Sequence, residues 1–319
     1  MQSRDQLMNM KWKKKGQIFV PPGNGFFKTH VTRSIPYRID PSTLRIYFSS
    51  RSSEDIPYPT FIDVDPACPD RILHINATPM MDLGRTGTFD DSGITPTCIL
   101  KHKNQVMMYY VGWKRRRYGV TIEASIGLAI LTDHGTKLKR CFEGPIIGQD
   151  KNHPIMTAAP FVLFDNRRYR MWYCSATEWR QCSGSPEPIY TVCYAESENG
   201  IDWKPLRKPI IQNRFDGEVV SAPWVIKAGN IYHMWYSTRG SATNEDKKFV
   251  IGYAKSPDGV KWRRLDSQAG IERSEDGWDS EMICYPSFFT HKDITYMFYS
   301  GNNVGKGGLG YAETKNFLL

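Results

Sequence analysis

The sequence predicts an all-β protein, a single five-bladed β-propeller domain over residues 1–319. The first observation is a repeated aromatic segment, YRMWYC at 169–174, YHMWYS at 232–237 and YMFYS at 296–300, which recurs about every 63 residues. The second is a proline that opens each repeat. The third is an incomplete last repeat whose missing strand resembles the N-terminal segment. A fixed period of this kind is typical of propellers and other repeat architectures.

Each unit begins with a proline at the head of a strand, where the missing N–H need not serve the sheet. An aromatic pair follows the proline at nearly constant distance, as Trp172-Tyr173 follows Pro160. We therefore count five units. Their opening prolines are Pro36, Pro96, Pro160, Pro223 and Pro286.

Each unit continues with a third apolar stretch and a turn that leads to a tryptophan. Examples are ENGIDW, which ends at Trp203, and PDGVKW, which ends at Trp262. Short β-rich runs separated by such turns are typical of antiparallel strands, so each unit is predicted to be a four-stranded antiparallel blade. The approximate blade boundaries are 26–80, 88–150, 153–212, 216–275, and 279–319 together with 8–20.

The fifth unit lacks the fourth-strand segment that ends the other units. The stretch MKWKKKGQI around Trp12 resembles the segments around Trp203 and Trp262. We expect this N-terminal strand to complete the last blade, because closing the ring covers sheet edges that would otherwise pair with other chains.

Composition narrows the function without deciding it. The chain has 42 lysines and arginines against 33 acidic residues, a formal charge of +9, and its longest basic run is residues 114–117. This modest excess does not indicate a nucleic-acid partner. No apolar stretch is long enough to cross a bilayer and no signal sequence is visible, so we expect a cytoplasmic protein with no membrane partner. Seven scattered cysteines predict reduced thiols, with no metal site and no cofactor.

The positions before the first strand of each blade predict a set of carboxylates at the channel. Residues before the first strand and after the second lie on one face of a meander, and inner strands line the channel of a propeller. Counting back from the opening proline gives Asp91, Glu218 and Glu281, which we interpret as three acids around one mouth. The candidate substrate-binding residues around them are Asp90, Asp216, Asp279, His153, His30 and Arg33.

The positions after the aromatic pairs predict a second set around the same mouth. Indole rings beside polar groups suit a sugar, which stacks its C–H face on an aromatic ring while its hydroxyls need hydrogen-bond partners. Arginines add the capacity to bind a carboxylate or phosphate. The members of this set are Arg51, Trp113, Trp179, Arg239 and Asn302.

The whole chain resembles the five-bladed glycoside hydrolase-like propellers. The segments that carry the resemblance are DDSGI at 90–94, AESENG at 195–200, AKSPDG at 254–259 and GWDSEM at 277–282. That superfamily includes arabinanases and β-xylosidases, invertases and levansucrases, and β-mannoside phosphorylases. The pattern is most similar to bacterial relatives of these enzymes that are encountered among surface-polysaccharide genes.

The resemblance implies roles for some of these residues. In the hydrolases, an Asp on the first blade is base or nucleophile, an Asp on the third tunes pKa, and a Glu on the fourth is the acid. Glu218 matches the acid, and its burial beside apolar neighbours is expected to raise its pKa. The first-blade and third-blade positions hold Val31 and Met156 instead, so a second catalytic carboxylate would have to be Asp91 or Glu281.

Phosphorylases of this kind need one protein carboxylate, because phosphate is the nucleophile. The resemblance implies that His30, Arg33, Arg51 and Arg239 would hold such an anion. It also implies that some relatives hold a calcium ion in the channel, although no loop here has calcium-ligand spacing.

Two functions follow from these observations. The first is a carbohydrate-active enzyme that cleaves or transfers a glycosyl unit in the central funnel, as a glycosidase, phosphorylase or transglycosylase. The alternative is a noncatalytic glycan-binding or scaffold propeller in polysaccharide biosynthesis. The expected ligand is an oligosaccharide, a sugar phosphate or a nucleotide sugar, with phosphate as a further partner. A catalytic site predicts two facing carboxyl groups, whereas a binding site predicts acids paired with arginines.

Overall fold

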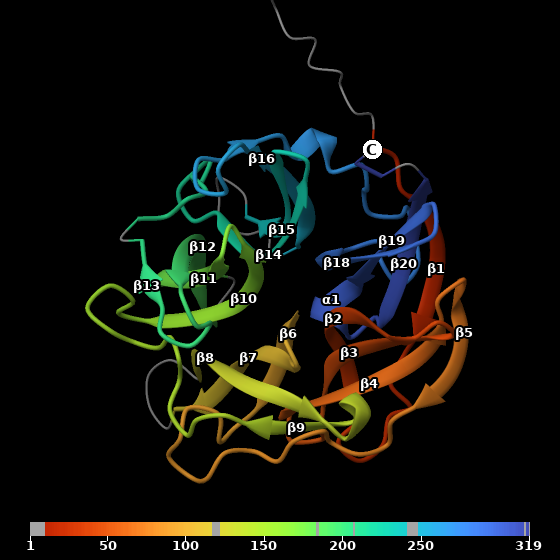
Figure 1. Cartoon of the computed structure of the whole chain (residues 1–319), viewed down its shortest axis with the longest axis horizontal. Helices are drawn as coiled ribbons and strands as arrows, with labels where there is room; N and C mark the ends of the chain where they lie inside the picture. The colour runs from red at the N-terminus through yellow and green to blue at the C-terminus, as the bar shows by residue number, and fades with distance from the viewer. Residues whose placement is uncertain are drawn as a thin grey trace, which may run out of the picture.

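The chain forms five four-stranded antiparallel sheets arranged in a ring around a central channel, as a computed structural model shows (Figure 1). The structure describes residues 10–116, 122–182, 185–206, 208–240, 248–315 and 317–318. The predicted five-bladed β-propeller is confirmed. In these residues no helix has the length and apolar character needed to span a membrane.

The blades follow one another in chain order. The first blade contains β2 (Thr29–Asp40), β3 (Thr43–Arg51), β4 (Pro57–Asp65) and β5 (Cys68–Ile75). The second contains β6 (Ile94–His102), β7 (Gln105–Arg115), β8 (Ile122–Thr132) and β9 (Lys137–Arg140), with the short helix η1 (Asp133–Gly135) between the last two. The third contains β10 (Met156–Asp165), β11 (Arg168–Cys182), β12 (Ser185–Ser197) and β13 (Lys204–Pro205).

The fourth and fifth blades complete the ring. The fourth contains β14 (Val219–Ala228), β15 (Ile231–Arg239), β16 (Val250–Ser256) and β17 (Arg263–Arg264), followed by the short helix η2 (Asp266–Gln268). The fifth contains β18 (Cys284–His291), β19 (Ile294–Ser300), β20 (Leu309–Lys315) and β1 (Lys13–Phe19), with α1 (Asn302–Gly305) between β19 and β20.

The N-terminal strand closes the last blade, as predicted. Strand β1 pairs antiparallel with β20, from Lys13 opposite Glu313 to Phe19 opposite Leu309, and Figure 1 shows the red strand beside the blue one. The buried ring of Trp12 packs against Phe288 at a centroid distance of 5.5 Å. The two ends of the described chain therefore share one hydrophobic core.

A β-bulge at one repeat position corrects the predicted alignment of the units. In the innermost strand of each blade, two consecutive residues lie opposite a single residue of the neighbouring strand. The bulged pairs are Arg33-Ser34, Pro96-Thr97, Ala159-Pro160, Ala222-Pro223 and Tyr285-Pro286. They recur every 63 residues in all five blades. The predicted alignment of Pro36 and Pro96 with Pro160 was therefore wrong. The residue equivalent to Pro160 is Ser34 in the first blade, two residues before Pro36, and Thr97 in the second blade, one residue after Pro96.

The corrected register changes which residues are equivalent. Asp91 lies one residue away from the position shared by Glu218 and Glu281, so the three acids do not form one ring. Another set does recur every 63 residues, and it consists of Phe27, Asp90, His153, Asp216 and Asp279.

The aromatic pairs fasten the blades to one another. In the first three blades, the first member of the pair donates a hydrogen bond to a glycine carbonyl in a turn of the next blade. The bonds run from Tyr47 to Gly135 (2.9 Å), from Tyr109 to Gly200 (3.0 Å) and from the Trp172 indole to Gly259 (2.8 Å). The second members, Tyr110, Tyr173, Tyr236 and Tyr299, are fully buried. The repeated aromatic segment therefore serves the packing of neighbouring blades.

Candidate functional site

A cavity of about 420 Å³ lies at the mouth of the central channel, and residues from all five blades line it. We call this cavity the funnel. Arg33, Arg51 and Arg239 line it together with the indole of Trp113, so four of the predicted substrate-binding residues come together there. Three further aromatic rings, Tyr190, Phe249 and Tyr285, also line it. The funnel thus combines cationic and aromatic surface in one space.

Three of these side chains occupy one repeat position after the aromatic pair. Arg51 pairs with the exposed Asp55 at 2.9 Å, and the Trp113 indole donates a 2.9 Å hydrogen bond to Thr95. Arg239 is nine-tenths buried, lies over the ring of Phe249, and pairs with Glu187 at 2.9 Å. The ends of β3, β7 and β15 therefore deliver them to the mouth, as the sequence predicted.

Arg33 reaches the funnel from a different position, the bulge in β2. Its backbone has φ 61°, a left-handed conformation that non-glycine residues seldom adopt. The guanidinium lies 4.5 Å from the ring centroid of Tyr285, and no described residue accepts a hydrogen bond from it. Arg33 is thus a cation with its donors available to a ligand.

The channel is narrow beside Arg33. A space of only about 20 Å³ remains there, and the second bulge residues of all five blades surround it: Ser34, Thr97, Pro160, Pro223 and Pro286. Such a volume holds about one water molecule. At this level the channel is therefore too narrow for a sugar, so a saccharide would enter the funnel from the mouth.

The carboxylate in the funnel, Glu187, was missed by the sequence analysis. It lies on β12, in a hairpin with β11 that stays paired as far as Cys182 opposite Ser185. This hairpin is longer than those of the other blades, and it places Glu187, Pro188 and Tyr190 against the cavity. Glu187 is the one acid among the described lining residues. The sequence signal was the extra length between Tyr173 and the third strand of this unit.

Glu218, the predicted acid, lies outside the funnel. Both oxygens accept 2.8 Å hydrogen bonds from Arg264, and further bonds come from the Thr238 hydroxyl (3.0 Å) and the Arg214 backbone N–H (2.6 Å). Burial raises the pKa of Glu218, but the hydrogen bonds from Arg264 and Arg214 outweigh it and hold the pKa below its usual value. The expected rise was therefore wrong, and the role of general acid stays a prediction without a supporting contact.

Asp90, His153 and Asp279 are buried beside the tyrosine that lies twenty residues later in the chain. The Tyr110 hydroxyl donates to Asp90 at 3.0 Å, and the Tyr299 hydroxyl donates to Asp279 at 2.9 Å. Nε2 of His153 lies 2.7 Å from the Tyr173 hydroxyl. These contacts tie the loop before each blade to its second strand, and none of the three side chains lines the funnel.

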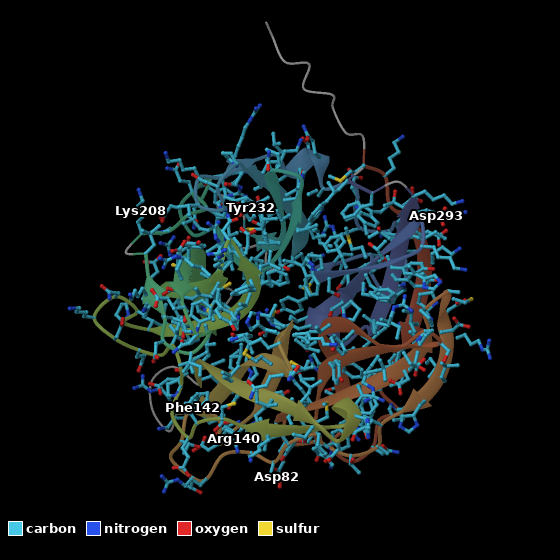
Figure 2. All side chains as sticks on the ribbon, viewed as in Figure 1. Asp82, Arg140, Phe142, Lys208, Tyr232 and Asp293 are labelled. Carbon is cyan, nitrogen blue, oxygen red and sulfur yellow. The ribbon has the colours of Figure 1, made fainter. Side chains whose placement is uncertain are left out.

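Basic residues compensate the charge of these acids. Arg140 bonds Asp90 at 2.8 Å and Lys14 bonds Asp279 at 2.7 Å. Arg140 lies beside Asp82 at the outer side of the second blade, where it also donates a 2.9 Å bond to the Asp82 carbonyl (Figure 2). We call Asp90, His153, Glu218 and Asp279, with these partners, the polar belt.

The other predicted residues are also placed outside the funnel wall. Asp91 accepts hydrogen bonds from the Gly87 N–H (2.8 Å) and the Ser92 hydroxyl (2.7 Å), and the Glu281 side chain is exposed. The Asn302 amide oxygen accepts hydrogen bonds from the backbone N–H groups of Glu281 and Met282 at 2.8 and 3.0 Å. Trp179 lies half-buried on the β11 extension, beside Arg180, which pairs with Asp216 at 2.9 Å.

His30 does not add charge to the predicted anion cradle. Its Nδ1 lies 2.8 Å from the Thr29 hydroxyl. Burial, and secondarily the charge of Arg51, lower the pKa of His30 to about 4. The imidazole is therefore neutral at pH 7, because protonation would place a second cation beside Arg51 in a poorly solvated position.

No metal site is visible in the part of the chain that the structure describes, where no group of three or more His, Cys, Asp or Glu side chains converges. Three of the predicted acids, Asp90, Glu218 and Asp279, are paired with cations in the polar belt. The cationic wall of the funnel is suited to an anion instead.

The ring of blades defines the class of this protein by its fold, which is a five-bladed β-propeller. A solved structure of a glycoside hydrolase superposes with a TM-score of 0.72 at 17% identity, covering 96% of this chain and 93% of the other. A glycosyl hydrolase from Bacteroides ovatus gives 0.70 at 12% identity, covering 98% and 92%. These likenesses establish the fold.

Sequence comparison places the chain in a particular family. The uncharacterized protein Rv1502 of Mycobacterium tuberculosis is 34% identical over 311 residues, which is 96% of this chain and all of the relative. The chain belongs to the same family as Rv1502. A 1,2-β-oligomannan phosphorylase of Thermoanaerobacter sp. is 27% identical over 133 residues, 40% of this chain and 44% of that protein. No family model matches the sequence.

Proposed function

We propose that the protein is a carbohydrate-active enzyme that binds a saccharide and a phosphate group together in the funnel and breaks or forms a glycosidic bond between them. The observation that carries this proposal is the composition of the funnel: three arginines and one carboxylate, framed by aromatic rings, in one cavity at the channel mouth. Glycosidase, transglycosylase and nucleotide-sugar-dependent reactions fit this composition less well.

The arginines supply an anion site. Arg33 has no acceptor among the described residues, and the partner of Arg51 is the exposed Asp55, a weak screened contact. Guanidinium groups bind phosphate oxygens in pairs, with charge-assisted hydrogen bonds that are roughly twice as strong as neutral ones. The funnel carries more cations than acids, which favours an anionic ligand.

The walls suit a sugar. Trp113, Tyr190 and Tyr285 present ring faces or edges to the cavity, and Thr32, Thr95 and Ser221 present hydroxyls. Because the channel beside Arg33 has room for about one water molecule, a saccharide would enter end-on from the mouth. This arrangement favours reaction at a chain end over reaction inside a polymer.

A single carboxylate is sufficient for phosphorolysis. Hydrolysis ordinarily needs two facing carboxyl groups, and the described funnel wall holds one. In phosphorolysis a phosphate oxygen forms a bond to the anomeric carbon while the glycosidic C–O bond breaks. Glu187 would give its proton to the departing oxygen, and the proton carried by hydrogen phosphate would then return to Glu187. The distant similarity to a 1,2-β-oligomannan phosphorylase supports this reaction class.

A noncatalytic glycan-binding role is the second candidate. The observation that favours it is the pairing of acids with bases: Glu218 with Arg264, Asp279 with Lys14, and Glu187 with Arg239. A propeller that keeps the ligand site and has lost the chemistry would show such pairing.

A phosphate-dependent turnover assay separates these candidates. The purified protein is offered oligosaccharides, including β-1,2-linked mannooligosaccharides, with and without phosphate, and release of glycosyl phosphate is measured beside ligand-induced thermal stabilisation. We expect turnover only with phosphate, and its loss in Glu187→Gln. Stabilisation without turnover would establish binding alone. If turnover were lost in Asp91→Asn, Glu218→Gln or Glu281→Gln while Glu187→Gln stayed active, the catalytic role would belong to the carboxylates predicted from the sequence.

A further inference from the structure

We infer that a second cavity, beside the funnel on the first blade, binds the distal sugar residues of an uncharged oligosaccharide whose reacting end lies in the funnel. This inference rests on the proposed function and deepens it, because it assigns the length and the charge of the saccharide. The cavity has a volume of about 540 Å³, and we call it the distal cavity. Its wall includes Phe26, Lys28, Ser53, Glu54 and Tyr58.

One short turn separates the distal cavity from the funnel. Strands β3 and β4 run side by side here, with Arg51 opposite Pro57, and both of these residues line the funnel. The turn between them, residues 52–56, contributes to the wall of the distal cavity. Paired strands lie about 5 Å apart, so the two cavities are near enough for one saccharide chain to occupy both.

The turn between the two cavities is held in place from two blades. The Ser52 N–H donates to the Ile56 carbonyl at 3.0 Å, and the Ser52 hydroxyl oxygen accepts a 3.2 Å hydrogen bond from the Glu54 N–H. Arg115 of the second blade donates a further bond to the Glu54 carbonyl. The turn therefore fixes the separation of the two cavities, and a saccharide that spans them binds without the cost of ordering a loop.

The aromatic wall of the distal cavity departs from the repeat. In the second blade, the equivalent of Phe26 is Phe89, which stacks on Tyr110 of the aromatic pair at a centroid distance of 5.9 Å. Phe26 stacks instead on its neighbour Phe27 at 5.3 Å, and its ring meets that of Tyr58 edge-on at 6.2 Å. Phe26 and Tyr58 are half-buried, so their rings form a surface on which a sugar can stack its C–H face.

The polar groups of the distal cavity are available to sugar hydroxyls. The side chains of Lys28, Ser53 and Glu54 and the hydroxyl of Tyr58 have no hydrogen-bond or ion-pair partner among the described residues. Each sugar hydroxyl both donates and accepts, which matches the donor Lys28 and the acceptor Glu54. One cation and one anion balance each other here, whereas the funnel carries three arginines. The distal cavity therefore suits uncharged sugar residues.

The test compares β-1,2-linked mannobiose with the corresponding tetrasaccharide on the full chain. For each saccharide, kcat/KM is measured with phosphate, and the dissociation constant is measured by calorimetric titration without phosphate. We expect the unaltered protein to favour the tetrasaccharide about tenfold in both measurements, because only the longer chain reaches the aromatic wall of the distal cavity. In Phe26→Ser this preference should disappear, and in Glu54→Ala it should become several-fold smaller.

Phe142→Ser is the matched control, because Phe142 is an exposed aromatic residue just beyond β9 that lines neither cavity. It should leave the preference unchanged. Equal preference for the two saccharides, or an unchanged preference in Phe26→Ser, would overturn the distal cavity while leaving the proposed function standing. A preference in binding that Phe26→Ser removes, without any turnover, would support the distal cavity and contradict the proposed catalysis. Binding of neither saccharide would contradict both.

Discussion

The funnel and the polar belt contain the same residue types at neighbouring repeat positions, but they differ in how charges are matched. In the belt, Glu218 accepts both of its principal hydrogen bonds from Arg264, and Asp279 has Lys14 and Tyr299. In the funnel, three arginines line a cavity that holds one glutamate, Glu187, which pairs with Arg239. Arg33 and the Nε of Arg239 have no acceptor among the described residues. The paired charges of the belt fix the loops between the blades, whereas the unpaired donors of the funnel remain available to bind a ligand.

The first blade shows that a belt contact can be replaced. At the position of Asp279 it has Phe27, and at the position of Tyr299 it has Phe48. The two phenyl rings lie 5.9 Å apart between centroids. Replacing both partners of a buried hydrogen bond by apolar groups is nearly neutral, whereas removing one is not. The belt is therefore a structural solution and has an apolar equivalent within the same chain.

The largest expected effect is on the belt. Arg264→Met leaves the buried Glu218 without its cation, and breaking a buried pair in this way typically costs about 3–5 kcal/mol. We expect a loss of this size in the free energy of unfolding by urea. Arg263→Met, one residue away and exposed on the same strand, should change it little. Equal losses in the two variants would show that charge matching does not stabilise the belt.

A smaller loss is expected when one hydroxyl is removed. Tyr299→Phe takes a hydrogen bond from the buried Asp279 carboxylate, and bonds to charged groups contribute about 1.5–3 kcal/mol. The matched control is Tyr47→Phe, which removes a bond to a neutral carbonyl and should cost about 1 kcal/mol. Thermal unfolding of the two variants and the unaltered protein would measure both losses in stability. A larger loss in Tyr47→Phe than in Tyr299→Phe would contradict the prediction.

The pH dependence of stability should also distinguish the two regions. The pKa of Glu218 is lower in the folded protein than its ordinary value of 4.5, so the unfolded state binds a proton first as pH falls. Its stabilising contribution is complete above about pH 4.5 and disappears as pH falls through the folded pKa. In Glu218→Gln, the free energy of unfolding should therefore fall less steeply with decreasing pH below about pH 4.5, in the acid limb of its pH profile. An unchanged limb would mean that other carboxylates dominate it.

The smallest effect on stability is expected in the funnel. Arg33→Gln removes a stacking contact with Tyr285, which contributes about 0.5–1 kcal/mol, and leaves no partner unpaired. The free energy of unfolding should fall by no more than that, while the rise in melting temperature that we expect from sulfate, which resembles the phosphate dianion, should disappear. A large loss of stability would place Arg33 with the belt.

The sequence predicted the fold because period and turn chemistry are local signals. The aromatic pairs, the ENG and PDG turns and the strand around Trp12 were sufficient to predict five blades and their closure. Arg51, Trp113 and Arg239 were placed correctly because positions after an aromatic pair do not depend on the bulge. Arg33 was also placed at the mouth, although its location in the bulge was not predicted.

The partners of the acids could not be predicted from the sequence. Asp91 and Asp90 are neighbours, and the position of the bulge decides which of them is equivalent to Asp279. An alignment based on the prolines could not locate the bulge to within one residue. The cations Arg264, Arg140 and Lys14 come from the fourth strands β17, β9 and β1, far along the chain from the acids that they pair with. Glu187 lies on a hairpin extension that has no counterpart among the described residues of the other blades, so no repeat position indicated it.

The pairing of β1 with β20 requires the two ends of the chain to meet, so the ring forms only with a loss of chain entropy. Strands inside a blade meet across short turns, but this pair joins residues that are far apart in the chain, such as Lys13 and Glu313, which are 300 positions apart. Closure entropy grows only with the logarithm of loop length, so sealing the ring costs about 1–2 kcal/mol more than a closure of blade length. When β1 detaches, β20 becomes an open edge that the same strand of another molecule fits equally well. The contact that completes one propeller is thus also a route by which two molecules exchange strands.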